Sequence, residues 1–149
     1  MANADRTYVD PSALRSLYLH DDRSRRFCDW RRRTGGALLL TRHGYGELVN
    51  SVALAVFRRV VPRATAQAAM DDMDQDVAEG RLRLVDLLWR RTLDRAVMLS
   101  KAHTPDLGTR TLDVLHVAAA LVLEMTTFVT YDERQARLAR AVRLRVLRP

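Results

Sequence analysis

Four carboxylates in separated parts of the chain occupy positions where an acid could do chemistry. Asp10 directly follows the short segment 7–9, and Asp132 follows the β-branched and aromatic run 127–130. Asp113 lies near the start of an almost wholly apolar stretch, and Glu47 lies near the start of another helical stretch. A carboxylate is costly to bury without a partner, so acids in such settings need a common explanation.

A divalent cation would supply that explanation. Two carboxylates ~4 Å apart repel by roughly 4 kcal/mol at an effective dielectric constant near 20, and a cation removes this repulsion. Ligands that are all oxygen atoms select hard ions such as Mg²⁺ or Mn²⁺. The expected chemistry is metal-assisted hydrolysis of phosphodiester bonds. The competing interpretation is four independent helix caps or surface acids, and for Asp10 taken alone a cap is the simpler interpretation.

The elements that must position these acids alternate between strands and helices. Three inner strands are expected near residues 7, 38 and 128, because the apolar run 37–40 and the pair 128–129 show no alternation. Alternating runs at 81–85 and 143–147 predict two edge strands with one wet face. Strands that alternate with helices indicate a mostly parallel five-stranded sheet in a three-layer α/β/α sandwich. The carboxyl ends of its strands and the starts of the following helices would bring the four acids together.

Helical spacing predicts further elements. Helices are expected at 22–33, from the first turn carrying Glu47 to about residue 60, from Pro62 onward, and at 90–103. In the last of these, Leu93 and Val97 are expected to face the core, and 104–108 is expected to be a loop. The early helices carry more apolar side chains than one flank of a small sheet needs, which predicts an exposed groove. The residues that suggest this groove are Leu14, Leu17, Tyr18, Leu19, Phe27, Trp30, Val52 and Phe57.

Composition sets the remaining bounds. The 149 residues are expected to form one domain, 1–149, and the net charge of +7 favours a polyanionic partner such as nucleic acid. A single cysteine, Cys28, permits neither an internal disulfide nor a cysteine metal cluster, which fits the cytoplasm. No apolar run is long enough to span a membrane, and the start lacks the apolar core of a signal peptide.

Three blocks of sequence resemble the PIN-domain ribonucleases, and within them the toxins of VapBC-type toxin–antitoxin pairs. The blocks are YVDPSAL at 8–14, RTLDVLHVAAA at 110–120 and FVTYD at 128–132, with Glu47 between the first two. The resemblance implies that Asp10, Glu47, Asp113 and Asp132 hold the metal, and that Ser12 and Thr130 support these ligands or bind a water on the metal. It also implies strand order 3-2-1-4-5, a homodimer and a cognate antitoxin bound in a groove of the early helices. The chain departs from the family pattern at Pro11 and at the pair Gly44 and Gly46.

Two further residues share a helical stripe with Asp113. Arg110 lies one turn before it, where it would orient Asp113 or contact a scissile phosphate, and His116 lies one turn after it. We expect His116 to contact a carboxylate or to be a packing residue rather than to bind metal. The sequence therefore predicts a Mg²⁺- or Mn²⁺-dependent endoribonuclease of toxin type. The alternative is a non-catalytic module of the same fold that binds RNA or a protein.

Overall fold

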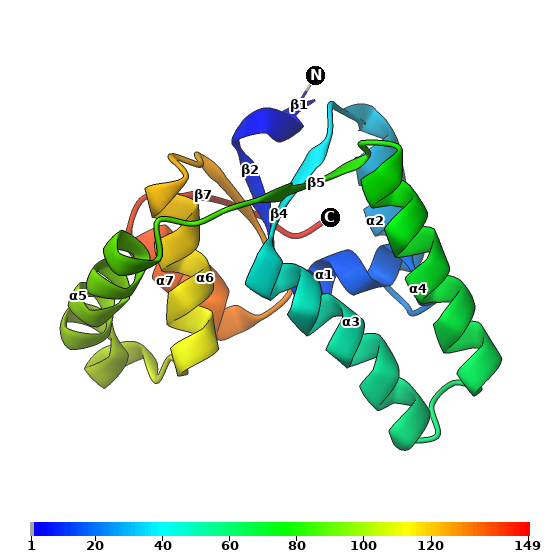
Figure 1. Cartoon of the computed structure of the whole chain (residues 1–149). Coiled ribbons are helices and arrows are strands. Elements are labelled where there is room, and N and C mark those ends of the chain that lie inside the picture. The colour runs from blue at the N-terminus through cyan, green and yellow to red at the C-terminus, as the bar shows by residue number, and fades with distance from the viewer. Residues whose placement is uncertain (1) are drawn as a thin grey trace.

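Five parallel strands form the central sheet of the computed structural model, which describes residues 2–149 (Figure 1). Their order is β5-β4-β2-β6-β7, which is 3-2-1-4-5 when these five are counted along the chain. The two alternating segments form the edge strands, and the three apolar segments form the inner ones, as predicted. The strands are β2 (Thr7–Val9), β4 (Leu38–Thr41), β5 (Leu82–Val85), β6 (Thr127–Val129) and β7 (Arg145–Leu147).

Helices cover both faces of this sheet, which gives the expected three-layer α/β/α arrangement (Figure 1). One layer holds α1 (Pro11–Leu14), α2 (Ser24–Arg33), α3 (Arg42–Phe57) and α4 (Arg63–Ala78). The other holds α5 (Trp89–Leu107), α6 (Thr111–Val122) and α7 (Glu133–Ala141). Short turns of 3-10 helix span Ala4–Arg6 and Arg15–Leu17, and a small sheet that the sequence did not predict pairs β1 (Ala2–Asn3) with β3 (Thr34–Gly35). No helix within residues 2–149 could cross a membrane.

Alternate side chains of the inner strands enter two separate cores. Val9, Leu40 and Val129 pack under the α1–α4 layer, whereas Tyr8 and Phe128 pack under the α5–α7 layer. Because successive side chains of a strand point to opposite faces, a strand covered on both sides buries side chains at every position. This is why the inner strands lack the alternation of apolar and charged residues seen in the edge strands.

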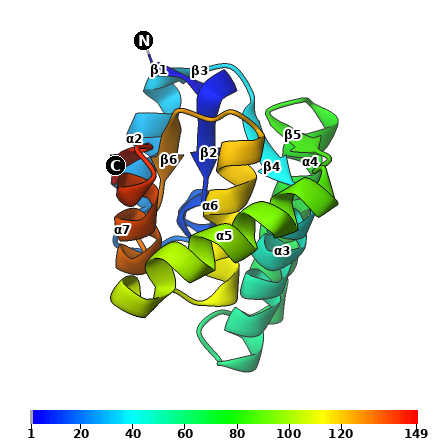
Figure 2. The ribbon, with the colours of Figure 1, turned by 90° about the vertical axis from the view of Figure 1, so that its left-hand side faces the viewer.

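Helix α5 departs from the prediction at its end and on its inner face. It continues through Pro105 to Leu107 and ends at Gly108, whose φ of 62° suits glycine, so most of the expected loop is helix. Leu93 and Val97 were expected to face the core, but they are 52% and 53% exposed. The reason is visible in Figure 2, where α5 crosses over α6 instead of lying on the sheet. Only a narrow side of α5 is covered, and that side carries Thr92 and Leu99.

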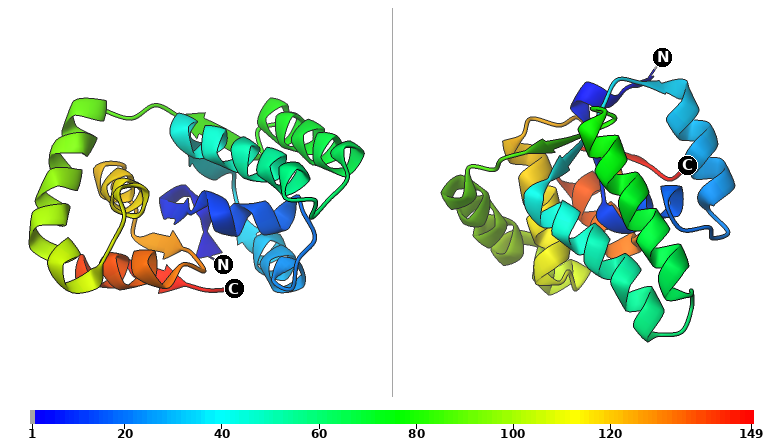
Figure 3. Two further views of the ribbon diagram at one scale, coloured as in Figure 1. Left: turned by 90° about the horizontal axis from the view of Figure 1, so that it is seen from below. Right: turned by 45° about the vertical axis from the view of Figure 1, so that its right-hand side comes forward.

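The predicted apolar groove on the early helices is largely wrong. Five of its eight residues are core residues, namely Leu14, Leu19, Phe27, Trp30 and Val52. Four helices share this flank and cover one another, so the apolar surface is used internally (Figure 3). Leu17 and Tyr18 remain partly buried, and Phe57 is exposed at the end of α3.

Candidate active site

The four predicted acids line one pocket of about 400 Å³ at the carboxyl ends of the strands. Asp10 follows β2 and Asp132 follows β6, and these strands are neighbours at the point where the chain switches sides of the sheet. Asp113 lies in the first turn of α6, as predicted. Glu47 lies in the second turn of α3, not in the first, because that helix already begins at Arg42.

Asp10 is fully buried and does not cap α1, although it occupies the capping position. Its backbone N–H donates to Val129 O at 2.9 Å, which extends the β2–β6 pairing to this residue. Its side chain accepts hydrogen bonds from the hydroxyls of Ser12 and Thr130, the latter at 3.3 Å. Burial raises the pKa of this carboxyl, and the donors around it and the neighbouring His116 offset part of that effect.

Asp132, by contrast, is a helix cap in full. Its Oδ1 accepts the backbone N–H groups of Arg134 at 2.8 Å and Gln135 at 3.1 Å, at the start of α7. Its own backbone N–H donates to Thr130 Oγ1 at 3.0 Å. Thr130 therefore connects the two acids that follow the inner strands.

Asp113 faces the pocket from the start of α6 and is nearly buried. Its Oδ2 accepts the backbone N–H of Arg110 at 2.9 Å, which fixes the carboxylate against the helix start. Arg110 thus orients Asp113 through its main chain. Its exposed side chain lines the same pocket and is available to contact a phosphate.

Glu47 reaches the pocket from α3 and bonds His116 of α6, with 2.7 Å between Oε2 and Nε2. This hydrogen bond lowers the pKa of the Glu47 carboxyl below its ordinary value. His116 is fully buried and does contact a carboxylate. The start of α3 is closely packed at Gly44, where an added Cβ would lie 2.9 Å from Thr41 Oγ1 and 3.3 Å from Pro11 Cγ. The two departures from the family pattern at Pro11 and Gly44 therefore pack against each other.

Sequence reasoning missed Gln135. This buried residue of α7 donates from Nε2 to Asp10 Oδ1 and to Asp113 Oδ1, both at 3.3 Å. The amide thus lies between the two most buried carboxylates of the pocket. The sequence offers one signal for this role, which is that Gln135 lies three residues after Asp132. That spacing places two side chains on the same face of a helix.

The pocket offers the donor set that a hard divalent cation requires. All of its acidic groups are carboxylates, and the hydroxyl of Ser12 also lines it. Within residues 2–149, no three His, Cys, Asp or Glu side chains lie close enough together to hold a metal ion as they stand. Three of the carboxylates have hydrogen-bond partners in the pocket: Gln135 bonds Asp10 and Asp113, and His116 bonds Glu47. The residues present fit Mg²⁺ or Mn²⁺ by their chemistry.

Comparison with protein families identifies the family of this chain. The family model of the PIN domain matches residues 7–141, so the chain belongs to the PIN domain family. PIN domains are typically metal-dependent nucleases, which makes this a family of hydrolases. No curated protein matches the chain.

Proposed function

We propose that this protein is a Mg²⁺- or Mn²⁺-dependent endoribonuclease and the toxin of a type II toxin–antitoxin pair. The observation that carries the proposal is the meeting of Asp10, Glu47, Asp113 and Asp132 in one pocket, from four separated segments. Membership of the PIN family supports phosphodiester hydrolysis. The net charge of +7 supports a polyanionic substrate, and RNA is the substrate proposed.

The residues of the pocket would divide the work of binding the cation and the phosphate. Asp10, Glu47, Asp113 and Asp132 would hold the cation, which lowers the pKa of water and neutralises charge that develops on the phosphate. Ser12 and Thr130 hold the Asp10 carboxylate by hydrogen bonds. The Arg110 side chain would bind the scissile phosphate at the mouth of the pocket.

Substitution of the acids tests the proposal. Asp10→Asn and Asp113→Asn should each lower cleavage of RNA by roughly a factor of 1,000 or more, because each removes a charged ligand from the ion. EDTA should stop the wild-type reaction, and Mg²⁺ or Mn²⁺ should restore it. Asp94→Asn, which changes an exposed aspartate of α5, is the matched control. Wild-type cleavage by either pocket variant would remove that residue from the ligand set.

Binding of RNA does not distinguish an enzyme from a non-catalytic module. Both should lose affinity steeply as salt rises, since arginine–phosphate contacts release counterions. Formation of product does distinguish them. A protein that binds structured RNA tightly and yields no product with either metal would support the non-catalytic alternative.

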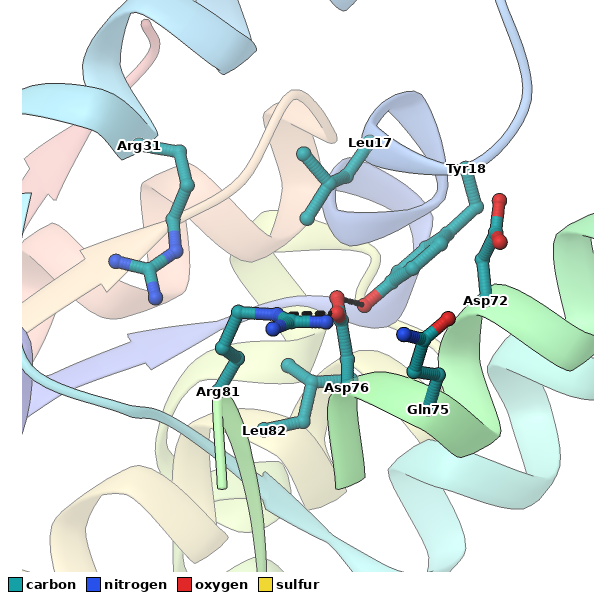
Figure 4. A pocket seen from close by; sticks show the side chains of 8 residues that line it. All are labelled: Leu17, Tyr18, Arg31, Asp72, Gln75, Asp76, Arg81 and Leu82. Carbon is teal, nitrogen blue, oxygen red and sulfur yellow. Dashed lines mark hydrogen bonds and ion pairs between the residues drawn. The ribbon is translucent and has the colours of Figure 1, made fainter. Parts of the chain in front are cut away.

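We further propose that the antitoxin binds at a pocket of about 340 Å³ between the turn Arg15–Leu17, α2, α4 and β5 (Figure 4). Leu17 and Leu82 supply its apolar part, and the Tyr18 hydroxyl donates to Asp76 at 2.7 Å. Leu17→Asp should weaken antitoxin binding while the free protein still cleaves RNA, because a buried charge opposes apolar docking. If the antitoxin inhibits this variant fully, the docking site lies elsewhere.

A homodimer is also proposed, with the outer face of α5 as its interface. Figures 2 and 3 show α5 as the outermost helix of its layer. We call this the α5 face and define it by its exposed residues Leu88, Trp89, Leu93, Val97, Met98 and Leu112, of which Leu88 directly precedes α5 and Leu112 belongs to α6. Exposed apolar side chains gathered in this way mark an interaction surface.

We propose that residues 1–149 act as one PIN domain in the cytoplasm, where RNA is available.

A further inference from the structure

Glu47 is joined to the other side of the sheet by a chain of buried hydrogen bonds. His116 Nε2 lies 2.7 Å from Glu47 Oε2, and His116 Nδ1 lies 2.7 Å from the Tyr8 hydroxyl. Tyr8 belongs to β2, His116 to α6 and Glu47 to α3. His116 is fully buried and Tyr8 nearly so, whereas the Glu47 side chain is 32% exposed towards the pocket.

The chemistry of the two ends sets the direction of these bonds. A carboxylate oxygen can only accept a hydrogen bond, so His116 Nε2 donates to Glu47 Oε2. The Tyr8 phenol carries one proton, which it can donate to Nδ1 at 2.7 Å. Donation from Tyr8 to Nδ1 and from Nε2 to Glu47 corresponds to the Nε2–H tautomer of His116.

The plane of the His116 ring is fixed as well. His43 stacks on it with 5.1 Å between ring centroids and 24° between planes, and Tyr8 packs at 5.9 Å and 57°. Burial lowers the pKa of His43 to about 4, so the His43 ring that stacks on His116 is uncharged at pH 7. His43 and Glu47 are four residues apart, on one side of α3. That side therefore contacts His116 twice, once on the ring face and once at Nε2.

We propose that His116 is a positioning residue that aims the Glu47 carboxylate at the ion shared with Asp113. The two residues of α6 lie one turn apart, so a single helix would present one ligand and hold another. A glutamate side chain has several free rotations, and fixing it beforehand removes entropy that binding would otherwise cost. This inference rests on the proposed metal site.

Titration of the metal-free protein with Mn²⁺, without RNA, tests the positioning role. His116→Leu should weaken binding by roughly 10-fold or more, the usual effect of losing a partner of a ligand. His116→Gln should recover part of the loss, because its amide can still donate to Glu47. Tyr8→Phe should weaken binding less, and nitrogen NMR should show the Nε2–H tautomer of His116 in the wild type and a mixture in this variant. Tyr45→Phe is the matched control, because that hydroxyl of α3 bonds Asp74 and not His116.

The outcomes separate this inference from the proposed function. Asp10→Asn and Asp113→Asn are titrated in the same way, and unchanged affinity in both would overturn the metal site itself. If those two lose affinity while His116→Leu and His116→Gln bind Mn²⁺ as the wild type does, only the positioning role is overturned. Should His116→Leu fail to fold, Tyr8→Phe decides. Wild-type affinity together with a mixed tautomer would then contradict the proposal.

Discussion

The acidic pocket and the α5 face lie next to each other. They differ in the burial and the bonding partners of their side chains. In the pocket, the carboxylates of Asp10 and Asp113 are buried and accept hydrogen bonds from neighbouring donors. On the α5 face, apolar side chains such as Val97 and Met98 are 53% and 62% exposed. Buried charge held by donors suits a cation, whereas uncovered apolar surface suits another protein.

The two regions meet at the start of α6. Leu112 lines the acidic pocket and is 51% exposed, and Thr111 lines both that pocket and an apolar hollow between α5 and α6. A partner on the α5 face would therefore stand beside the substrate entrance. This proximity links the proposed dimer to the proposed catalysis.

Among the substitutions that test this comparison, the one at Val97 should have the largest effect. Val97→Asp places a charge in a surface that the dimer would bury, so the dimer dissociation constant should rise roughly 100-fold or more. Sedimentation of the purified protein over a range of concentrations measures this. Phe57→Asp is the control, because Phe57 is 83% exposed but lies at the far end of α3. A wild-type protein that stays monomeric at every concentration would refute the interface.

Gln135→Met should destabilise the pocket itself. The variant keeps the length of the side chain but removes both hydrogen bonds to Asp10 and Asp113, which should cost about 2 kcal/mol in the metal-free protein. Saturating Mn²⁺ should reduce the difference in the free energy of unfolding between the variant and the wild type, because the cation neutralises the same carboxylates. Denaturant unfolding with and without Mn²⁺ measures both values.

Gln67→Met is the matched control for this change, since Gln67 donates to one exposed carboxylate, that of Asp71, at 2.9 Å. It should alter stability by less than about 0.5 kcal/mol, as surface substitutions do. Equal effects at both positions would mean that the bonds of Gln135 have no special part in the pocket.

The smallest effect expected is on pH dependence. Burial favours the neutral Asp10 carboxyl, so the folded protein keeps this proton at pH values where the unfolded chain has lost it. The contribution of Asp10 to the stability of the metal-free protein therefore falls as pH rises from the ordinary pKa of 3.8 through the raised pKa. Asp10→Asn should flatten the stability profile in this range.

Glu47 should show the opposite sign in the same measurements. Its pKa is lowered, so its contribution is present above the ordinary value of 4.5 and is lost as pH falls through the lowered pKa. Unfolding by denaturant at a series of pH values, without metal, separates the two groups. Asp106→Asn, at an exposed aspartate, is the control for Asp10→Asn and should leave the profile unchanged. A profile that Asp10→Asn does not alter would contradict the raised pKa.

The sequence by itself determined the sheet and the places of the acids. The edge strands β5 and β7 alternate between charged and apolar residues and the inner strands do not, because burial on one face or on two leaves different periods. Asp10 and Asp132 follow inner strands, so parallel topology alone brings them to one edge of the sheet. These features depend on neighbours along the chain, which a sequence displays.

Only the tertiary structure decided which side of each helix is covered and which distant side chains meet. Leu93 and Val97 have the spacing of a core stripe, yet α6 lies between α5 and the sheet and leaves them exposed. The bond from His116 to Glu47 joins residues 69 positions apart, and the amide of Gln135 meets an acid 125 positions away. Periodicity shows that a helix has an apolar side, but the partner of that side depends on how the layers pack.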